Sequence, residues 1–278
     1  MSTVPNITLN DGVQIPQLGF GVFQIDPDDT KDATLTALRA GYRHIDTAQM
    51  YGNEAQVGEA IRAFEADRSD IFVTSKLNNS NHDRDDALAS FDTTLSDLGV
   101  EELDLFLIHW PMPDVGDFVE TWRAMEEIKA TGRCRSIGVS NFQPAHLRRL
   151  ADETDTAPSV NQIEVHPYFV QDDMRAANAE RGIATEAWSP IAQGKVLDDD
   201  TLIEIGKAHH KTAAQVTLRW HIQRGDIIFP KSVTPSRVAE NFDIFDVDLT
   251  DDEMARITGL DRDQRNGPNP DEFNMIPK

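Results

Sequence analysis

The sequence predicts a single closed barrel of eight parallel strands alternating with helices, the (β/α)8 or TIM-barrel class. Segments between the strands show helical spacing of apolar residues, for example across 88–98 and 118–128. About 250 residues is the usual length of such a barrel, which this chain matches. The eight expected strands are short apolar or β-branched runs at 18–21, 43–46, 71–76, 103–110, 135–141, 160–164, 183–188 and 226–232.

The strands are almost continuously apolar, which favours parallel strands that helices cover. A doubly wound open sheet is the main alternative. That fold carries the phosphate-binding pattern G-x-G-x-x-G after its first strand, and the stretch GFGVFQ at 19–24 lacks the third glycine. The closed barrel is therefore the better prediction.

Two segments outside the repeating units are expected at the ends of the barrel. Residues 6–16 contain two β-prone runs around Asn10-Asp11-Gly12, a strong hairpin pattern, and this hairpin should cap the barrel floor. The tail, 259–278, is rich in Pro and Asn and is expected as a loop over the mouth. We expect 1–278 to form one domain, with no linker.

Two further helices exceed the regular count of the barrel. They are expected at 213–223 and 250–258, packed outside the regular helices. The second follows the capping-box pattern, because Thr250 precedes it and Glu253 stands three residues later.

Composition narrows the classes of function. The chain has 278 residues, 39% of them hydrophobic, and a formal charge of −22 from 48 acidic and 26 basic residues. That charge disfavours nucleic-acid binding. No run approaches the roughly 18 apolar residues of a membrane span, and the N-terminus does not resemble a leader. One cysteine, Cys134, excludes an internal disulfide. We expect a cytoplasmic monomer; its acidic surface fits ordinary solubility or, alternatively, a high-salt origin.

Polar residues gather where the expected strands end. In a barrel of this class the carboxyl ends of the strands surround one mouth, where active sites lie. Taken singly, each residue has a simpler explanation, such as a cap, a solvated strand end or a structural histidine. Their convergence at one rim is the strongest functional pattern in the sequence. The residues are Asp46, Lys76, His109, Asn141, Gln162, Ser189 and Lys231.

Four side chains at this rim have complementary chemistry. Asp46, Lys76 and His109 end three consecutive strands, and Tyr51 lies one loop away. A phenol with an ordinary pKa of about 10 is a poor acid, and a neighbouring ammonium such as that of Lys76 lowers its pKa. Asp46 would keep the lysine charged. His109 would hydrogen-bond the oxygen that is reduced.

At these residues the sequence resembles the aldo-keto reductase family over nearly its whole length, most of all small prokaryotic members such as 2,5-diketo-gluconate reductases. The resemblance assigns the catalytic tetrad to Asp46, Tyr51, Lys76 and His109. It implies NADPH-dependent reduction of aldehydes or ketones, with Tyr51 as proton donor. The matching stretches are LGFGVFQ, GYRHIDTAQMYGNE, VTSKL, LDLFLIHWP, IGVSNF, NQIEVHP, AWSPIAQGK and IFPKSV.

The resemblance also implies how NADP(H) is held. Ser140, Asn141 and Gln162 would bind the nicotinamide carboxamide, and Trp188 would stack on the ring. The loop after the seventh strand would cover the pyrophosphate, and the stretch 229–241 would bind the adenosine phosphate. The residues expected in these two segments are Ser189, Pro190, Ile191, Gln193, Phe229, Lys231, Ser232, Val233, Arg237 and Asn241.

Cofactor choice depends on the second of these segments. A lysine and an arginine, Lys231 and Arg237, suit the dianionic 2′-phosphate of NADP, since guanidinium matches phosphate geometry. The following helix adds free N–H groups. Thr234 stands where similar proteins carry an arginine, which softens the preference for NADP.

The substrate pocket is expected to be apolar with a few polar groups. Phe23, Trp110 and Phe142 would line it, together with Tyr51 and His109.

Asn78 departs from the tryptophan common in the family, so polar, oxygenated carbonyl compounds, diketo sugar acids among them, should be tolerated. No metal is expected, because Glu164 and His166 lack further ligands at zinc-like spacing. A purely binding role, as in potassium-channel β subunits or lens crystallins, is the alternative to catalysis.

Overall fold

The computed structural model describes residues 4–276. The strands are β1 (Asn6–Thr8), β2 (Gln14–Pro16), β3 (Phe20–Gly21), β4 (His44–Asp46), β5 (Phe72–Leu77), β6 (Leu103–Ile108), β7 (Cys134–Ser140), β8 (Val160–Glu164), β9 (Ala184–Trp188) and β10 (Ile227–Ile228). The α-helices are α1 (Pro27–Ala40), α2 (Glu54–Ala63), α3 (Arg84–Leu98), α4 (Phe118–Ala130), α5 (Pro144–Glu153), α6 (Asp172–Ala179), α7 (Asp200–His209), α8 (Ala213–Arg224), α9 (Pro235–Phe242) and α10 (Asp251–Thr258).

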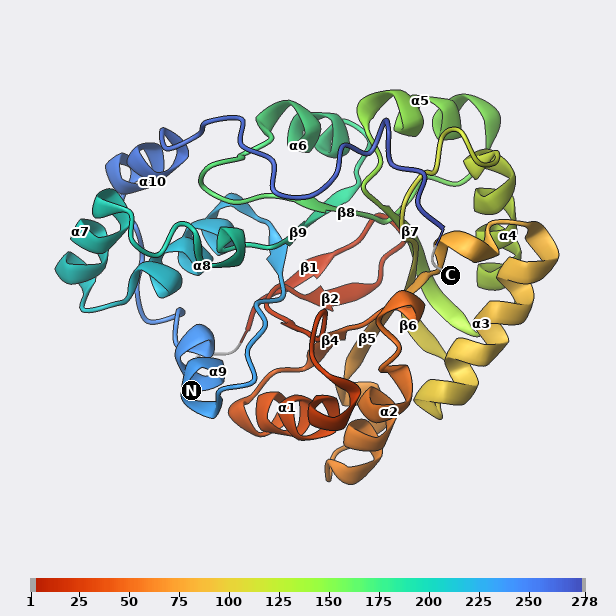
Figure 1. Cartoon of the computed structure of the whole chain (residues 1–278), viewed down its shortest axis with the longest axis horizontal. Helices are drawn as coiled ribbons and strands as arrows, with labels where there is room; N and C mark the ends of the chain where they lie inside the picture. Colours follow the sequence, from red (N-terminus) through yellow and green to blue (C-terminus); the bar gives the residue numbers. More distant parts are fainter. Residues whose placement is uncertain (1–3, 277–278) are drawn as a thin grey trace.

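Eight strands, β3 to β10, form one parallel sheet that follows chain order. The sheet closes between its first and last strands. Leu18 pairs with Ile228 in a parallel bridge, and the amide of Gly19 donates to the Ile228 carbonyl at 2.7 Å. Helices surround the strands (Figure 1), so the predicted (β/α)8 barrel is confirmed.

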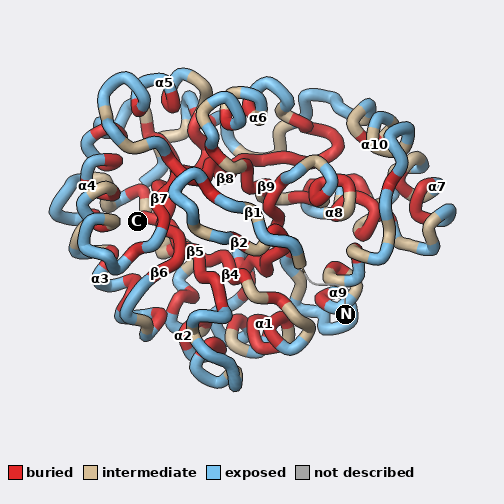
Figure 2. Tube along the Cα trace, turned by 180° about the vertical axis from the view of Figure 1, so that it is seen from behind, coloured by how far each residue is buried: buried red, intermediate tan, exposed pale blue. Residues whose placement is uncertain are grey.

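The N-terminal hairpin closes the amino-terminal end of the barrel, as predicted. β1 pairs with β2 antiparallel, and Gly12 takes the positive φ of 87° that the turn requires. Leu9 and Ile15 of this segment pack against apolar residues from the strand starts, including Phe72 and Val160. Figure 2 shows the hairpin lying across the end of the barrel that faces the viewer.

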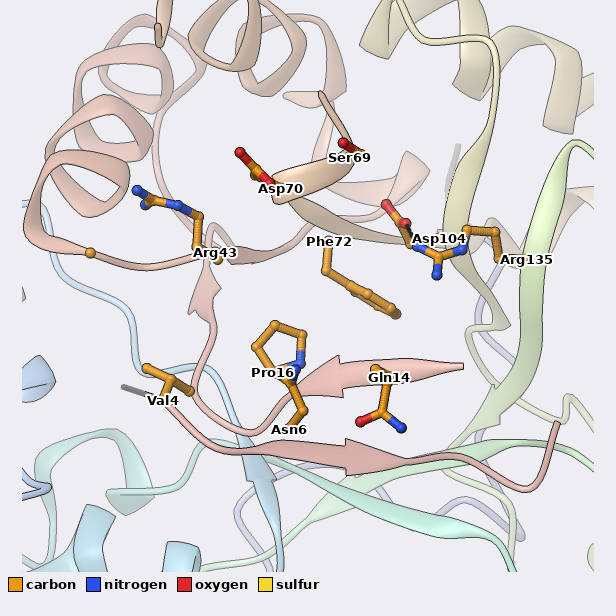
Figure 3. A pocket seen from close by; sticks show the side chains of 11 residues that line it. Val4, Asn6, Gln14, Pro16, Arg43, Ser69, Asp70, Phe72, Asp104 and Arg135 are labelled. Atoms are coloured by element: carbon orange, nitrogen blue, oxygen red, sulfur yellow. Dashed lines mark hydrogen bonds and ion pairs between the residues drawn. The ribbon is translucent and has the colours of Figure 1, made fainter. Parts of the chain in front are cut away.

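A hollow of about 520 Å³ lies beside this hairpin, at the floor. Figure 3 shows Phe72 between the hairpin and the ion pair of Asp104 with Arg135, whose atoms are 2.7 Å apart. Asn6 and Pro16 of the hairpin also line the hollow. None of the side chains predicted for the active site lines this hollow.

Helix ends follow local capping chemistry. Asp26 caps α1, whose first residue is Pro27, and Gly41 ends it with φ of 116°. The predicted capping box at α10 is present, because Thr250 accepts from the Glu253 amide and the Glu253 side chain accepts from the Thr250 amide.

Two helices follow β9, and only one of them covers the barrel. α8 packs against β10, whereas α7 packs against α8 and α10. The extra helix in this connection is therefore α7, not the predicted 213–223, because α8 buries Trp220 and Leu218 completely. The second predicted extra helix is α10.

Inside the barrel, side chains of alternate strand residues fill the centre. On β5 these are Phe72, Thr74 and Lys76, which change from apolar at the floor to charged near the mouth. All three are at most 5% exposed. The interior thus carries a polar layer at its carboxyl-terminal end, above an apolar plug.

No helix between Val4 and Ile276 is both long and apolar enough to traverse a lipid bilayer. The predicted domain 1–278 includes residues 1–3 and 277–278, which lie outside the described residues.

Candidate active site

Lys76 and Asp46 form an ion pair inside the barrel. Lys76 Nζ lies 2.7 Å from Asp46 Oδ1 and 2.8 Å from Oδ2, and it also donates to the Thr47 carbonyl at 2.8 Å. The lysine is 0% exposed and the aspartate 2%. Strand geometry explains the contact, since β4 and β5 are neighbours and both side chains point inward.

Tyr51 stands over this pair. Its hydroxyl is 3.4 Å from Lys76 Nζ, and its ring is partly exposed. The short 3-10 helix Gln49–Tyr51 carries it.

Gln49 holds that turn to two neighbours. Its Nε2 donates to Thr94 Oγ1 at 2.9 Å, and its Oε1 accepts from the Asn78 amide at 2.8 Å. These bonds fix the backbone that positions the phenol.

Burial and the charges of the ion pair together determine the pKa values of Tyr51, Asp46 and Lys76. Burial raises the pKa of Tyr51, and the charge of Lys76 opposes this without reversing it. The expected net lowering of the phenol pKa is therefore wrong, because loss of solvent outweighs the ammonium. Burial also raises the pKa of Asp46, against the bonds from Lys76. Burial works to lower the pKa of Lys76, yet the charge of Asp46 outweighs it and the pKa is raised.

His109 completes the group. Its ring centroid is 5.8 Å from that of Tyr51, edge to face, and the residue is 8% exposed. Burial, followed by the charge of Lys76, lowers the pKa of His109 well below its ordinary value, so the imidazole is neutral. Its Nδ1 has no hydrogen-bond partner among the described residues.

Ser140, Asn141 and Trp188 form a second connected group at the mouth. Asn141 Nδ2 donates to Ser140 Oγ at 3.1 Å and to the His109 carbonyl at 3.0 Å. Trp188 Nε1 donates to Asn141 Oδ1 at 2.9 Å, which fixes the indole plane. Asn141 takes φ of 64°, in the left-handed region. The structure thus joins these three predicted residues to the tetrad.

Gln162, the fourth residue predicted to bind the carboxamide, faces the barrel centre. Its Nε2 donates to Asp46 Oδ2 at 2.9 Å and to Glu186 Oε2 at 2.8 Å. Both amide hydrogens are therefore used inside the protein.

The loop after β9 has unusual backbone geometry. Ser189, Ala192 and Gln193 have φ of 51°, 50° and 56°, respectively, which is uncommon for residues other than glycine. Pro190 is buried and Ile191 is partly buried, while Gln193 is exposed. The predicted pyrophosphate segment is thus a tight turn that rises from the strand end.

The stretch 229–241 presents two basic side chains to solvent. Lys231 and Arg237 are exposed and form no ion pair within residues 4–276. Ser232 Oγ accepts from the Thr234 amide at 3.1 Å, at the start of α9. The other predicted residues here differ in burial: Phe229 and Asn241 are 7% exposed, and Val233 is 54% exposed.

Comparison with known proteins agrees with this geometry. The model of the aldo/keto reductase family matches residues 17–262. The chain belongs to the aldo/keto reductase family.

Individual members of the family are similar over almost the whole chain. An aldo/keto reductase structure from Brucella melitensis is 53% identical, with a TM-score of 0.92, covering 94% of this chain and 99% of that one. Methylglyoxal reductase DkgA of Yersinia pestis is 46% identical over 276 residues, covering 98% of this chain and 99% of its own. A Gox0644 mutant structure in complex with NADPH is 43% identical, with a TM-score of 0.94, covering 98% of this chain and 99% of that one.

The predicted substrate residues divide into two sets. Phe23 is 50% exposed and packs on Tyr51, with ring centroids 5.0 Å apart, and Trp110 stacks on Phe273 at 4.2 Å. Phe142, by contrast, is fully buried against Phe118 and His146, on the helix side of β7. Its predicted direct contact with substrate is therefore not supported, because the ring belongs to the core.

The C-terminal segment of the chain passes over the loops that follow the strands. Asn79 Nδ2 donates to the Met275 carbonyl at 2.9 Å, and the Asp114 amide donates to Asn274 Oδ1 at 2.9 Å. Figure 1 shows the segment, in dark blue, running from α10 past α6 to the C-terminus near α4.

Glu164, at the end of β8, also binds the C-terminal segment. Its Oε1 accepts from the Asn266 amide at 2.6 Å, and its Oε2 accepts from the Gly267 amide at 2.9 Å. A Cβ on Gly267 would lie 2.5 Å from Trp188 Cη2, so the tail backbone presses on the indole edge. The C-terminal segment is therefore in direct contact with the Trp188 indole.

Glu186 belongs to the polar layer around Asp46 but was not among the residues predicted from the sequence. It lies in the expected strand 183–188 and is 0% exposed. The available pattern was a glutamate two residues before Trp188, and therefore on the same face of the strand as the aromatic at its end.

Proposed function

We propose that the protein is an NADPH-dependent reductase that converts aldehydes or ketones to alcohols, with Tyr51 as the proton donor. The observation that carries the proposal is the buried ion pair of Lys76 with Asp46, whose ammonium lies 3.4 Å from the Tyr51 hydroxyl. Such an arrangement stabilises a phenolate at the moment when the phenol gives up its proton.

The side chains divide the work. Tyr51 is protonated near neutral pH, as an ordinary phenol is, and burial raises its pKa further. Lys76 then stabilises the phenolate, and Asp46 keeps Lys76 charged. Neutral His109 donates a hydrogen bond to the carbonyl oxygen and orients it toward the phenol.

The residues fit a nicotinamide dinucleotide. Trp188 is held flat by Asn141 and offers a face for a ring. The exposed Lys231 precedes α9, and the exposed Arg237 lies in its first turn, where helix amides lack an intrahelical partner and suit an anion. The cofactor, when bound, supplies the hydride. The NADPH complex of the related Gox0644 mutant supports this choice, and the preference over NADH rests on the two basic residues.

The substrates proposed are small oxygenated carbonyl compounds, including diketo sugar acids. Asn78 stands where tryptophan is common in the family, and its smaller, polar amide suits a polar substrate group. The name methylglyoxal reductase, carried by the related DkgA, points the same way. We further propose that the protein acts as a cytoplasmic monomer.

A spectrophotometric assay tests the proposal. NADPH absorbance is followed with methylglyoxal, a diketo sugar acid, an α-keto ester and a plain aromatic aldehyde, and each is repeated with NADH. We expect turnover of the oxygenated compounds with NADPH at lower KM than with NADH. Binding of NADPH without oxidation by any compound in the panel would favour a purely binding role.

A further inference from the structure

Glu186 is a carboxyl group enclosed within the barrel. It lies on β9, paired in register with Gln162 of β8 and Ile227 of β10, and it is 0% exposed. Since alternate residues point inward, its side chain shares the polar layer with Asp46 and Lys76. The roles proposed above leave this group unused.

One amide links the two carboxyl groups of this layer. Gln162 Nε2 donates to Glu186 Oε2 at 2.8 Å and to Asp46 Oδ2 at 2.9 Å. Asp46 in turn binds Lys76, which approaches Tyr51. A continuous chain of contacts thus runs from Glu186 to the catalytic phenol.

The layer holds one cation for two carboxyl groups. The Lys76 ammonium donates to Asp46, to the Thr47 carbonyl and to the Tyr51 hydroxyl, and it makes no hydrogen bond to Glu186. Glu186 Oε1 has no partner among the described residues. A second buried carboxylate without a cation is costly, so the proton belongs on Glu186.

We propose that Glu186 is a positioning residue that stays protonated during turnover and, through Gln162, holds Asp46 as the sole counter-charge of Lys76. The consequence for turnover rests on the proposed function. The protonation of Glu186 is independent of the proposed function.

The expected pH dependence follows from the groups that face Glu186. Burial, then the charge of Asp46, raises the pKa of Glu186 to about 8, while Lys76 and Gln162 oppose this. Above that pH the layer gains a negative charge beside Asp46. The added charge disfavours a phenolate at Tyr51, so reduction slows as pH rises through about 8.

The test compares pH profiles of kcat for the holoenzyme and Glu186→Gln, which keeps the shape and an uncharged group. The wild type should lose about tenfold in kcat across the alkaline limb, equivalent to one pKa unit at Tyr51. Glu186→Gln should match the wild type near neutral pH and lose this limb. Profiles that superimpose would overturn the proposal.

Glu54→Gln is the matched control. Glu54 is also a buried carboxyl, 6% exposed, but its bond goes to Ser75 Oγ. Glu54→Gln should therefore still show the fall in kcat above pH 8. If both variants lose that fall, a specific role for Glu186 is contradicted.

Infrared spectroscopy with ¹³C-labelled glutamate tests the protonation without turnover. A protonated carboxyl band should persist at pH 7 in Glu54→Gln and disappear on alkaline titration. Absence of the band at pH 7 would refute the proposal even if Glu186→Gln fails to fold. A protein that shows the band but reduces no carbonyl compound would instead refute the proposed function alone.

Discussion

Lys76 and Asp46 meet through both carboxylate oxygens, at 2.7 and 2.8 Å, in the closed interior of the barrel. The pair therefore stabilises the barrel interior and, in the proposed reaction, supplies the ammonium beside Tyr51. Neither partner can be removed without leaving the other buried and unpaired, and Tyr51 loses its neighbouring ammonium if the lysine is lost.

Lys76→Met should reduce kcat by about 10² to 10⁴, because the phenolate of Tyr51 loses its stabilising charge. It should also lower the free energy of unfolding by about 3 kcal/mol or more, since Asp46 is left without its cation. Steady-state kinetics and urea denaturation measure the two effects. Lys31→Met is the control, because Lys31 pairs with Glu59 at the surface. Wild-type kcat in Lys76→Met would contradict the assigned role.

Arg237→Ala should raise KM for NADPH by about 10- to 100-fold, the worth of a charged hydrogen bond of about 1.5 to 3 kcal/mol. KM for NADH should barely change, because NADH lacks the 2′-phosphate. The exposed Arg148 provides the control, as Arg148→Ala removes the same charge from α5. An equal increase in KM for NADPH and NADH would show that Arg237 does not bind the 2′-phosphate.

Gly267→Ala should weaken NADPH binding several-fold, since the new Cβ would lie 2.5 Å from Trp188 and must displace it. Fluorescence titration with NADPH measures the affinity directly. At Gly116 an added Cβ meets no atom within 4 Å, so Gly116→Ala should bind like the wild type. An unchanged affinity in Gly267→Ala would mean that the tail does not position the indole.

Acid should destabilise the protein through His44. Burial lowers the pKa of His44 from 6.5 to about 3, so the unfolded chain takes up the proton first. The contribution of neutral His44 is complete above pH 6.5 and is lost as pH falls toward 3. Urea midpoints at pH 7 and 5 should differ less in His44→Asn than in the wild type. An equal or larger difference in the variant would exclude His44 as a source.

The barrel could be predicted from the sequence because strand and helix patterns alternate at the right length. The capping box at Thr250 was likewise readable from two residues. The choice between α7 and α8 as the extra helix was not readable, since it depends on which helix reaches β10.

The positions of the site residues could be predicted where they lie at strand ends. The pKa values could not be predicted, because they depend on how deeply each group is buried. Asp46, Lys76 and His109 follow from three consecutive strand ends, and Tyr51 follows from the loop after the first of them. The resemblance added their assignment as a catalytic tetrad. The pKa of Tyr51 could not be predicted, because its direction depends on how fully the phenol is desolvated. Glu186 was overlooked because its spacing from Trp188 indicates only a shared face of the strand, and its contacts with Gln162 depend on the packing of the barrel interior.

Loss of the Tyr51 hydroxyl is the most direct test of the central claim that this phenol delivers the proton. The measurement is single-turnover oxidation of bound NADPH by the best aldehyde substrate, in the wild type and in Tyr51→Phe, with NADPH affinity measured on the same samples. The variant should keep its affinity within a few-fold and lose about 10² to 10⁴ in rate. A variant that binds NADPH and turns over at the wild-type rate would contradict the claim.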